Sequence, residues 1–235
     1  MLLSIQQPEY FPWLGFLDKL HQADTTVWLD HVQFKKRYFE NRNKVRDHTG
    51  WRWLRTPVLT KGRDGQPINQ VEIDNSAPWT RKLVATLRHA YGRAPYWSPG
   101  GEELCELVLS RPWTKLVDFN LAVIELLRRW FGLTGVTRRS SELGVTAQGS
   151  DLILEIATLT GADAYLVGSL GGNYLREEDF RARGIRLVPQ DFQHPVYPQL
   201  HPGPFLPGLS AVDLWLNLGP GAREVLAGGR ADANP

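Results

Sequence analysis

Short apolar runs that end abruptly in polar clusters constrain the fold of this chain most strongly. Leu2 to Ile5 forms one such run and stops at Gln6-Gln7-Pro8, and Thr26 to Leu29 forms another and stops at Asp30-His31. Apolar runs of this length, bounded by proline and polar residues, are typical of buried strands. Joined by a helix, the two strands would form a βαβ unit whose polar ends leave the sheet at one edge. Ligands bind at that edge in open α/β sheets.

Further elements follow from the hydrophobic spacing. Helical periodicity marks segments 12–20, 79–91, 101–110, 115–131, 150–160 and 210–219, and strand patterns mark 51–58, 68–73, 164–167 and 185–188. The segment between Asp30 and Asn43 is expected to be a loop, partly helical. We therefore predict an α/β fold: a mostly parallel sheet of short strands flanked by helices, with a mainly helical insertion at about 79–131. A single domain would span 1–227, followed by a disordered tail at 228–235.

Composition limits the class of protein. The 235 residues include one cysteine, Cys105, which excludes an internal disulfide and fits a reducing compartment. The net charge is +2, and the densest basic cluster, Lys35-Lys36-Arg37, suits a single phosphate or carboxylate better than a duplex. No apolar stretch approaches the roughly 20 residues of a membrane span, and no signal peptide is apparent. We expect a cytoplasmic protein with a small-molecule substrate, without duplex nucleic acid or membrane partners.

The first candidate site consists of the polar residues that follow the first two strands. Asp30 offers a carboxylate as a catalytic base. The substrate-binding candidates here are Gln6, Gln7, Tyr10, Gln33, Lys36, Arg37, Asn41, Arg42 and Asn43. The Asn41-Arg42-Asn43 run cannot place all three side chains on one surface of a helix or strand, so it fits a loop. Alternatively, Asp30 pairs with Arg37 or Arg42 and only pins that loop.

The second candidate site is the glycine-rich segment Gly168-Ser169-Leu170-Gly171-Gly172-Asn173-Tyr174, which follows a predicted strand. Adjacent glycines allow positive φ, so the amides around Gly171 and Gly172 could form a nest for an anion or an oxyanion, with Tyr174 beside them. The segment is neither a Walker loop nor a dinucleotide fingerprint. A simple turn is the alternative.

The third candidate site runs from Gln190 to Gln199 after the last predicted strand. His194 is the second candidate base, and Tyr197 and Gln199 would contact the substrate. The six histidines are scattered and none is paired four residues from another, so no metal site is predicted. Cys105 reads as a core residue. Asp213 reads as structural, because Ser210 to Asp213 matches a capping box.

These residues together resemble the WbqC-like family. The resemblance lies in Gln6-Gln7-Pro8 through Phe16 with Lys19, Asp30 through Arg37, Asn41-Arg42-Asn43, Tyr165 through Leu175, Tyr197 with Gln199, and Leu209 through Gly219. It extends in order from residue 1 to about 225. Many members have His where this chain has Gln6, so an essential base at that position would have to be replaced here by another residue.

The resemblance implies a place in bacterial O-antigen, other surface-polysaccharide or secondary-metabolite pathways, with a glycine-transferase role suggested for the family. The first βαβ unit is also loosely similar to the nucleotidyltransferase-like arrangement of pantothenate synthetases, where a strand-end loop holds ATP. The His-x-Gly-His pair of that superfamily is absent from this sequence. That second similarity is therefore one of fold only.

Three functions are expected from these sites. The first is an acyl or aminoacyl transferase, for example of glycyl, that makes an amide with an amine of a sugar or small scaffold, using a carrier-protein thioester, an aminoacyl-tRNA or an acyl adenylate as donor. Asp30 or His194 would be the base, Gly171-Gly172 with Gln7 or Asn43 would hold the oxyanion, and Lys36, Arg37 and Arg42 would bind phosphate or carboxylate. The alternatives are an ATP-dependent amide ligase or other nucleotide-binding enzyme, and a non-catalytic ligand-binding partner of a pathway enzyme. The sequence specifies no cofactor. Each enzymatic function requires the three clusters to meet around a common cavity.

Overall fold

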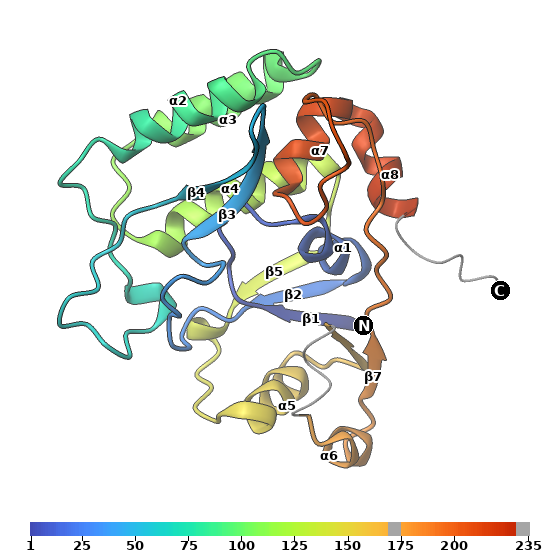
Figure 1. The fold of residues 1–235 in the computed structure, drawn as a ribbon. Coiled ribbons are helices and arrows are strands. Elements are labelled where there is room, and N and C mark those ends of the chain that lie inside the picture. Colours follow the sequence, from blue (N-terminus) through green and yellow to red (C-terminus); the bar gives the residue numbers. More distant parts are fainter. Residues whose placement is uncertain (169–174, 229–235) are drawn as a thin grey trace.

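A five-stranded parallel sheet forms the centre of the computed structural model, which describes residues 1–168 and 175–228 (Figure 1). The order across the sheet is β5-β2-β1-β6-β7. The strands are β1 (Leu2–Gln6), β2 (Thr25–Trp28), β5 (Val136–Arg139), β6 (Ala164–Val167) and β7 (Arg186–Pro189). This sheet with its flanking helices confirms the predicted α/β class.

The central strand, β1, marks a reversal in the path of the chain. From β1 the chain moves outward through β2 to β5, and then returns to the other side of β1 to form β6 and β7. The strand order therefore changes direction between β1 and β6. In open α/β sheets, the crevice beyond the carboxyl ends of the strands at such a point is where ligands bind.

The parallel registers align one residue from each strand, or from just beyond its end, in a single row at the carboxyl edge of the sheet. Pairing of β1 with β2, and of β2 with β5, aligns Gln6 with Trp28 and Arg139. Extending the β1–β6 and β6–β7 registers past their last pairs adds Gly168 and Gln190 to the same row. The row thus joins polar groups from residues that are far apart in the sequence.

Helices cover both faces of the sheet (Figure 1). One face carries a small apolar core with α5 (Gly149–Leu159) and α6 (Glu177–Ala182). The other carries a larger core built from α1 (Leu14–Gln22), α2 (Trp79–Tyr91), α3 (Glu102–Leu109), α4 (Leu116–Phe131), α7 (Ala211–Leu218) and α8 (Ala222–Gly228). The predicted helical stretch forms α2 to α4 and shares this core with α1. Among residues 1–168 and 175–228, no helix combines the length and apolar character needed to cross a bilayer.

Two segments differ from the sequence prediction. Segment 68–73 is not a strand but a 3-10 turn, Ile68–Gln70, because its amides donate to the carbonyl oxygens of Asp30 and Val32 in the loop after β2. The Asn41-Arg42-Asn43 run does not lie wholly in a loop. It leads into β3 (Arg42–Asp47), which pairs antiparallel with β4 (Gly50–Arg55) as a hairpin.

The edge strand β5 was missed. Its side chains alternate between exposed and half-buried, and Val136 is 57% exposed. A four-residue strand that contains two arginines carries too weak an apolar pattern to be recognised.

A buried carboxylate ties the C-terminal helices to the hairpin. Asp213 of α7 is 1% exposed and accepts hydrogen bonds from the hydroxyls of Tyr91 and Tyr197 and from the amide of Gln199. Gln199 in turn accepts from the Arg46 guanidinium of β3. Burial raises the pKa of Asp213, although these donors act against the rise. Its side chain therefore serves this network rather than a capping box.

We expect Asp213→Ala to lower the free energy of unfolding by about 3 kcal/mol, because three buried donors lose their acceptor together. Urea unfolding at pH 7 measures the change. The control is Asp179→Ala on α6, which removes an exposed ion pair with the preceding Arg176 and should cost less than about 1 kcal/mol. Equal effects of the two substitutions would contradict the proposed importance of the network.

Candidate functional site

A cavity of about 520 Å³ lies at the carboxyl ends of β1 and β6. Three members of the strand-end row, Gln6, Gly168 and Gln190, line it. Its volume suits a small molecule, and aromatic walls with a few polar groups are typical of ligand sites. The other lining side chains include Trp13, Phe16, Tyr38, Phe39 and Tyr165, with Glu9, Lys19 and Lys44 as the charged members.

Glu9 and Lys19 are the ionisable pair of this cavity. Lys19 projects from α1, and its Nζ donates to the carbonyl oxygen of Ile5 at 3.4 Å. Burial lowers the pKa of Lys19 to about 8, and the Glu9 carboxylate opposes that change. Burial also raises the pKa of Glu9 to about 8, with a further rise from Glu40 and an opposing effect from Lys19. Both pKa values therefore lie close to neutral pH, where each group can gain or lose a proton.

One oxygen of the Glu9 carboxylate has no hydrogen-bond donor among the described residues. This oxygen, Oε2, is buried and accepts no hydrogen bond from the part of the chain that the structure describes. A buried oxygen without a donor is costly, so it marks a position where a ligand or water would bind.

Gln190 and Gly168 also line this cavity. The Gln190 amide donates to the carbonyl oxygen of Gly15 at 2.8 Å and to Oδ2 of Asp18 at 2.7 Å. This leaves its Oε1 directed toward Gly168, where an added Cβ would lie 4.0 Å from Oε1 and 3.8 Å from the Lys19 Nζ. A glycine at this strand end therefore leaves both polar atoms uncovered.

Asn120 of α4 holds together the two segments that carry the carboxylates. It is fully buried, and its Nδ2 donates to the carbonyl oxygens of Pro8 at 2.9 Å and Glu40 at 2.8 Å. Glu40 is 1% exposed, and its carboxylate accepts no hydrogen bond of normal geometry within residues 1–168 and 175–228. Burial raises the pKa of Glu40 to about 7. By holding both segments, Asn120 keeps the Glu40 carboxylate close enough to Glu9 to raise the pKa of Glu9.

Asn43 supports the same loop from the hairpin. Its Nδ2 donates to the carbonyl oxygen of Phe11 at 2.9 Å, and both residues are fully buried. Phe11 has a φ of 47°, a left-handed conformation that is strained for a residue with a side chain. Tyr10 is also fully buried, and its amide donates to the Phe39 carbonyl oxygen at 2.9 Å. Tyr10 and Asn43, predicted to bind substrate, instead fix the loop that presents Glu9.

Asp30 lies at another part of the sheet edge, between the ends of β2 and β5. It is fully buried, and its oxygens accept from the Ser141 amide at 2.9 Å, both serine hydroxyls of Ser140-Ser141, and the Arg139 Nε at 2.7 Å. Burial alone would raise the pKa of Asp30, but these donors outweigh it and the pKa is lowered. A carboxylate held by this many donors is a poor base. Its ion-pair partner is Arg139, not the predicted Arg37 or Arg42.

His194 is also engaged by backbone groups. Its Nε2 accepts from the Gly208 amide at 3.1 Å, and its Nδ1 lies 2.9 Å from the Pro195 carbonyl oxygen. Burial lowers its pKa. This geometry favours a neutral ring that pins the loop. Tyr197 and Gln199 likewise point to the buried carboxylate of α7 rather than to the cavity.

The structure places the remaining predicted residues as follows. Gln6 lines the cavity, with its Nε2 3.4 Å from the Phe16 carbonyl oxygen. Gln7 is half-buried, and Arg37 and Gln33 are exposed, the latter beside a separate hollow near the start of α5. Lys36 forms an ion pair with Asp64. Asn41 donates to the Thr56 carbonyl oxygen, and the Arg42 guanidinium lies over the Trp53 ring. Gly171, Gly172 and Tyr174 lie outside the described residues.

Sequence reasoning did not name Glu9, Lys19, Glu40 or Asn120 as catalytic or substrate-binding residues, and Gln190 only marked the start of the third candidate segment. Two of these residues carried a usable signal. Lys19 lies within the buried face of its helix, between Leu17 and Leu20, and Asn120 interrupts the apolar stripe of α4. Lysine and asparagine rarely occupy such positions unless a specific partner holds them.

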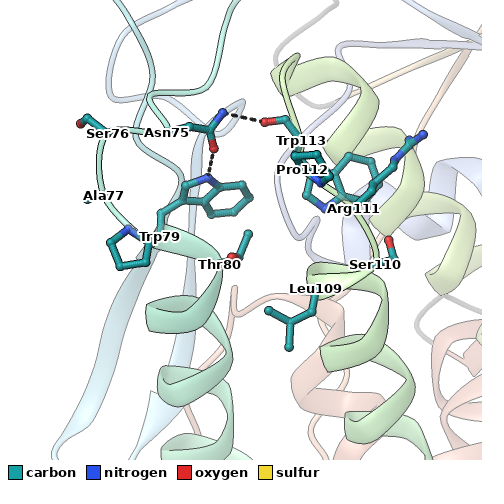
Figure 2. Close-up of a pocket in the computed structure, with 11 residues that line it drawn as sticks. Asn75, Ser76, Ala77, Trp79, Thr80, Leu109, Ser110, Arg111, Pro112 and Trp113 are labelled. Atoms are coloured by element: carbon teal, nitrogen blue, oxygen red, sulfur yellow. Dashed lines mark hydrogen bonds between the residues drawn. The ribbon is translucent and has the colours of Figure 1, made fainter.

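A second, larger cavity, of about 640 Å³, lies between the start of α2 and the segment that joins α3 to α4 (Figure 2). Asn75 bridges its walls: it donates to the Trp113 carbonyl oxygen and accepts from the Trp79 indole, each at 2.9 Å. Arg111 is the one ionisable side chain among its described lining residues, and its guanidinium lies over the Trp113 ring. Without a carboxylate, lysine or histidine in that lining, this cavity is a poor candidate for acid–base chemistry.

The fold and the site define the class: an α/β protein with a cavity at the point where the order of its parallel strands reverses. The profile of the WbqC-like protein family matches residues 7–225, and the chain belongs to that family. It is 26% identical over 225 residues to "Uncharacterized protein Rv1507c" from Mycobacterium tuberculosis (strain ATCC 25618 / H37Rv), a match that covers 95% of this chain and 96% of the relative. No solved structure matches the chain. The profile match over residues 7–225 confirms the family that the sequence predicted.

We expect Glu40→Gln to stabilise the protein more at pH 8 than at pH 5. The folded pKa of about 7 exceeds the ordinary value of 4.5, so between these pH values the unfolded chain loses its proton first. The contribution of Glu40 to the free energy of unfolding of the wild type should then fall by up to about 3 kcal/mol as the pH rises. Glutamine does not ionise, so the variant lacks this loss. Urea unfolding of both proteins at pH 5 and pH 8 tests this, and a stability difference independent of pH would contradict it.

Proposed function

We propose that this protein is a biosynthetic transferase that forms an amide by moving an acyl or aminoacyl group, such as glycyl, to an amine of a sugar or small scaffold. The observation that carries the proposal is the Glu9–Lys19 pair in the cavity at the strand-order reversal. The family resemblance to proteins of surface-polysaccharide and secondary-metabolite pathways supports it. Activated acyl donors are made in the cytoplasm, where we place the protein.

Glu9 would activate the acceptor. A protonated amine is not a nucleophile, so the reaction starts when the Glu9 carboxylate removes a proton from it. A pKa of about 8 makes this carboxylate a far better base than an ordinary glutamate. The nitrogen lone pair then forms a bond to the acyl carbon, and the electrons of the C=O π bond move to the oxygen.

Lys19 would stabilise the oxyanion. Its ammonium group lies beside the same cavity in a buried setting, where a positive charge is more effective than in water. When the intermediate collapses, the C–N bond remains and the bond to the leaving group breaks. The proton held by Glu9 then passes to the departing sulfur or oxygen, which restores the carboxylate. The restored carboxylate accepts the second proton from the still positively charged nitrogen and releases it to water, which leaves a neutral amide.

The remaining lining groups would orient the substrates. The amides of Gln6 and Gln190 can bind polar groups of donor or acceptor, and Trp13 and Phe16 supply apolar walls. Gln6 occupies the position where many family members have His, and an amide cannot accept the amine proton. Glu9 supplies this chain with a base three residues further along the same loop.

An ATP-dependent amide ligase is the second candidate. The order of the five strands, with the first strand central and a reversal beside it, is that of nucleotide-binding sheets. A ligase should be stabilised by ATP with magnesium in a thermal-shift assay, whereas a transferase that uses a preformed donor should not.

Glu9→Gln should lower amide formation by about 100-fold or more, because it removes the base while keeping the shape of the side chain. The assay uses a glycyl thioester of N-acetylcysteamine with a panel of amino sugars, and mass spectrometry detects the amide. Glutamine also removes a costly buried charge, so the variant should unfold no more easily than the wild type.

Asp30→Asn is the comparison variant. It should weaken the contact between β2 and β5 and lower stability, yet folded protein should keep most of its turnover. Loss of turnover in Asp30→Asn with full turnover in Glu9→Gln would sink the assignment of the base. No amide from any acceptor, together with tight binding of a small molecule, would favour the non-catalytic alternative.

The rate should rise with pH toward about pH 8, since Glu9 must be deprotonated, and should fall above it as Lys19 loses its proton. Glu40→Gln should move the rising limb to lower pH, because the Glu40 carboxylate contributes to the raised pKa of Glu9. Steady-state rates measured from pH 5.5 to pH 9.5 test this. An unmoved limb in a folded variant would contradict the role of Glu9.

A further inference from the structure

Three side chains with metal-binding atoms converge at the tip of the β3–β4 hairpin, on a part of the surface that the proposed function does not use. Asp47 ends β3, His48 lies in the turn, and His89 lies in the last turn of α2. One ligand atom from each lies within 4.8 Å of the other two. The two imidazole rings are 5.2 Å apart and nearly perpendicular. The histidines are 41 positions apart in the sequence, so their spacing gave no signal.

The carboxylate of this cluster is held in place. Asp47 is 1% exposed, and its Oδ1 accepts from the amide and hydroxyl of Thr49 at 2.8 and 2.7 Å. Its Oδ2 forms an ion pair with Arg52. Hydrogen bonds of this kind orient carboxylates that bind metals, and with Arg52 they lower the pKa of Asp47 against the effect of burial.

The two histidines are accessible to solvent, and the groups around them attract a cation electrostatically. Both are exposed, so an ion can reach them from solvent without opening the core. His89 is two residues before the end of α2, where the free carbonyl groups give the helix its negative end. That end and the Asp47 carboxylate both attract a cation, while Arg52 shares the carboxylate and sets a limit on the affinity.

We propose that Asp47, His48 and His89 form a binding site for a divalent transition metal ion, for which zinc is the best match. Two imidazoles and one carboxylate are a common zinc ligand set, and water would complete the coordination. Because its ligands come from the hairpin and from α2, the ion would link these elements. The same two elements line a groove of about 560 Å³ that includes Trp53 and Lys82, so metal binding would fix the separation of its walls.

The test uses the full chain without a polyhistidine tag, freed of metal by a chelator. Calorimetric titration with zinc chloride should show one ion per chain, and His48→Ala and His89→Ala should each weaken binding at least about tenfold. The control is His21→Ala, an exposed histidine on α1 outside the cluster, which should bind as the wild type does. Zinc should raise the melting temperature of the wild type by a few degrees, and EDTA should reverse the rise.

Both histidine variants alter exposed side chains, so they should fold. Unchanged affinity in both variants, or no saturable binding of one ion per chain to the wild type, would overturn the site. Weaker binding by His21→Ala equal to that of the two cluster variants would show nonspecific surface binding and overturn it as well.

Discussion

The parallel hydrogen-bond register of β1 with its two neighbours is the constraint on which the rest of this structure depends. Parallel strands end on the same side, so the register decides which residues share an edge. Here it sets Gln6, Gly168 and Gln190 in one row, although they come from opposite ends of the sequence. A shift of one residue in β1 would turn Gln6 to the other face of the sheet and bury a polar amide in the apolar core. The cavity and its polar lining therefore exist only in this register.

Buried ionisable groups give the candidate site its reactivity, and they lower the stability of the fold. Glu9, Lys19 and Glu40 all have pKa values displaced in the direction that opposes their charge. Such groups persist only where the surrounding structure holds them, and Asn120 and Asn43 do this by fixing the backbone on either side. The residues that act on a ligand and the residues that position them are thus different sets. Both of these asparagines are fully buried.

The sequence predicted well what depends on local pattern and less well what depends on partners. The apolar runs of β1, β2 and β6 and the helical spacing of α2 located those elements to within a residue or so. The edge strand β5 escaped because its four residues include two arginines and carry too weak an apolar pattern. For the site, the strand-end rule led to Gln6, Asp30 and His194 alike, and the last two were assigned as bases from their residue type alone. Whether a base is free depends on donors such as Ser141 and Gly208, which only the folded chain brings near. Glu9 and Lys19 were overlooked because burial, which only the folded chain produces, displaces their pKa values.

The connection between β2 and β5 has a consequence for how this molecule folds. The two strands are neighbours in the sheet, yet 107 residues separate Trp28 from Val136, and these residues include the hairpin and the helices α2 to α4. Closing so long a segment costs entropy before any strand pairing repays it, so contacts of high sequence separation form late. β1, α1 and β2 can assemble from adjacent chain, whereas the β5 edge must await the helices that precede it. Asp30 receives its donors from Arg139, Ser140 and Ser141 only then, so its burial reports the last step in assembly of this half of the sheet.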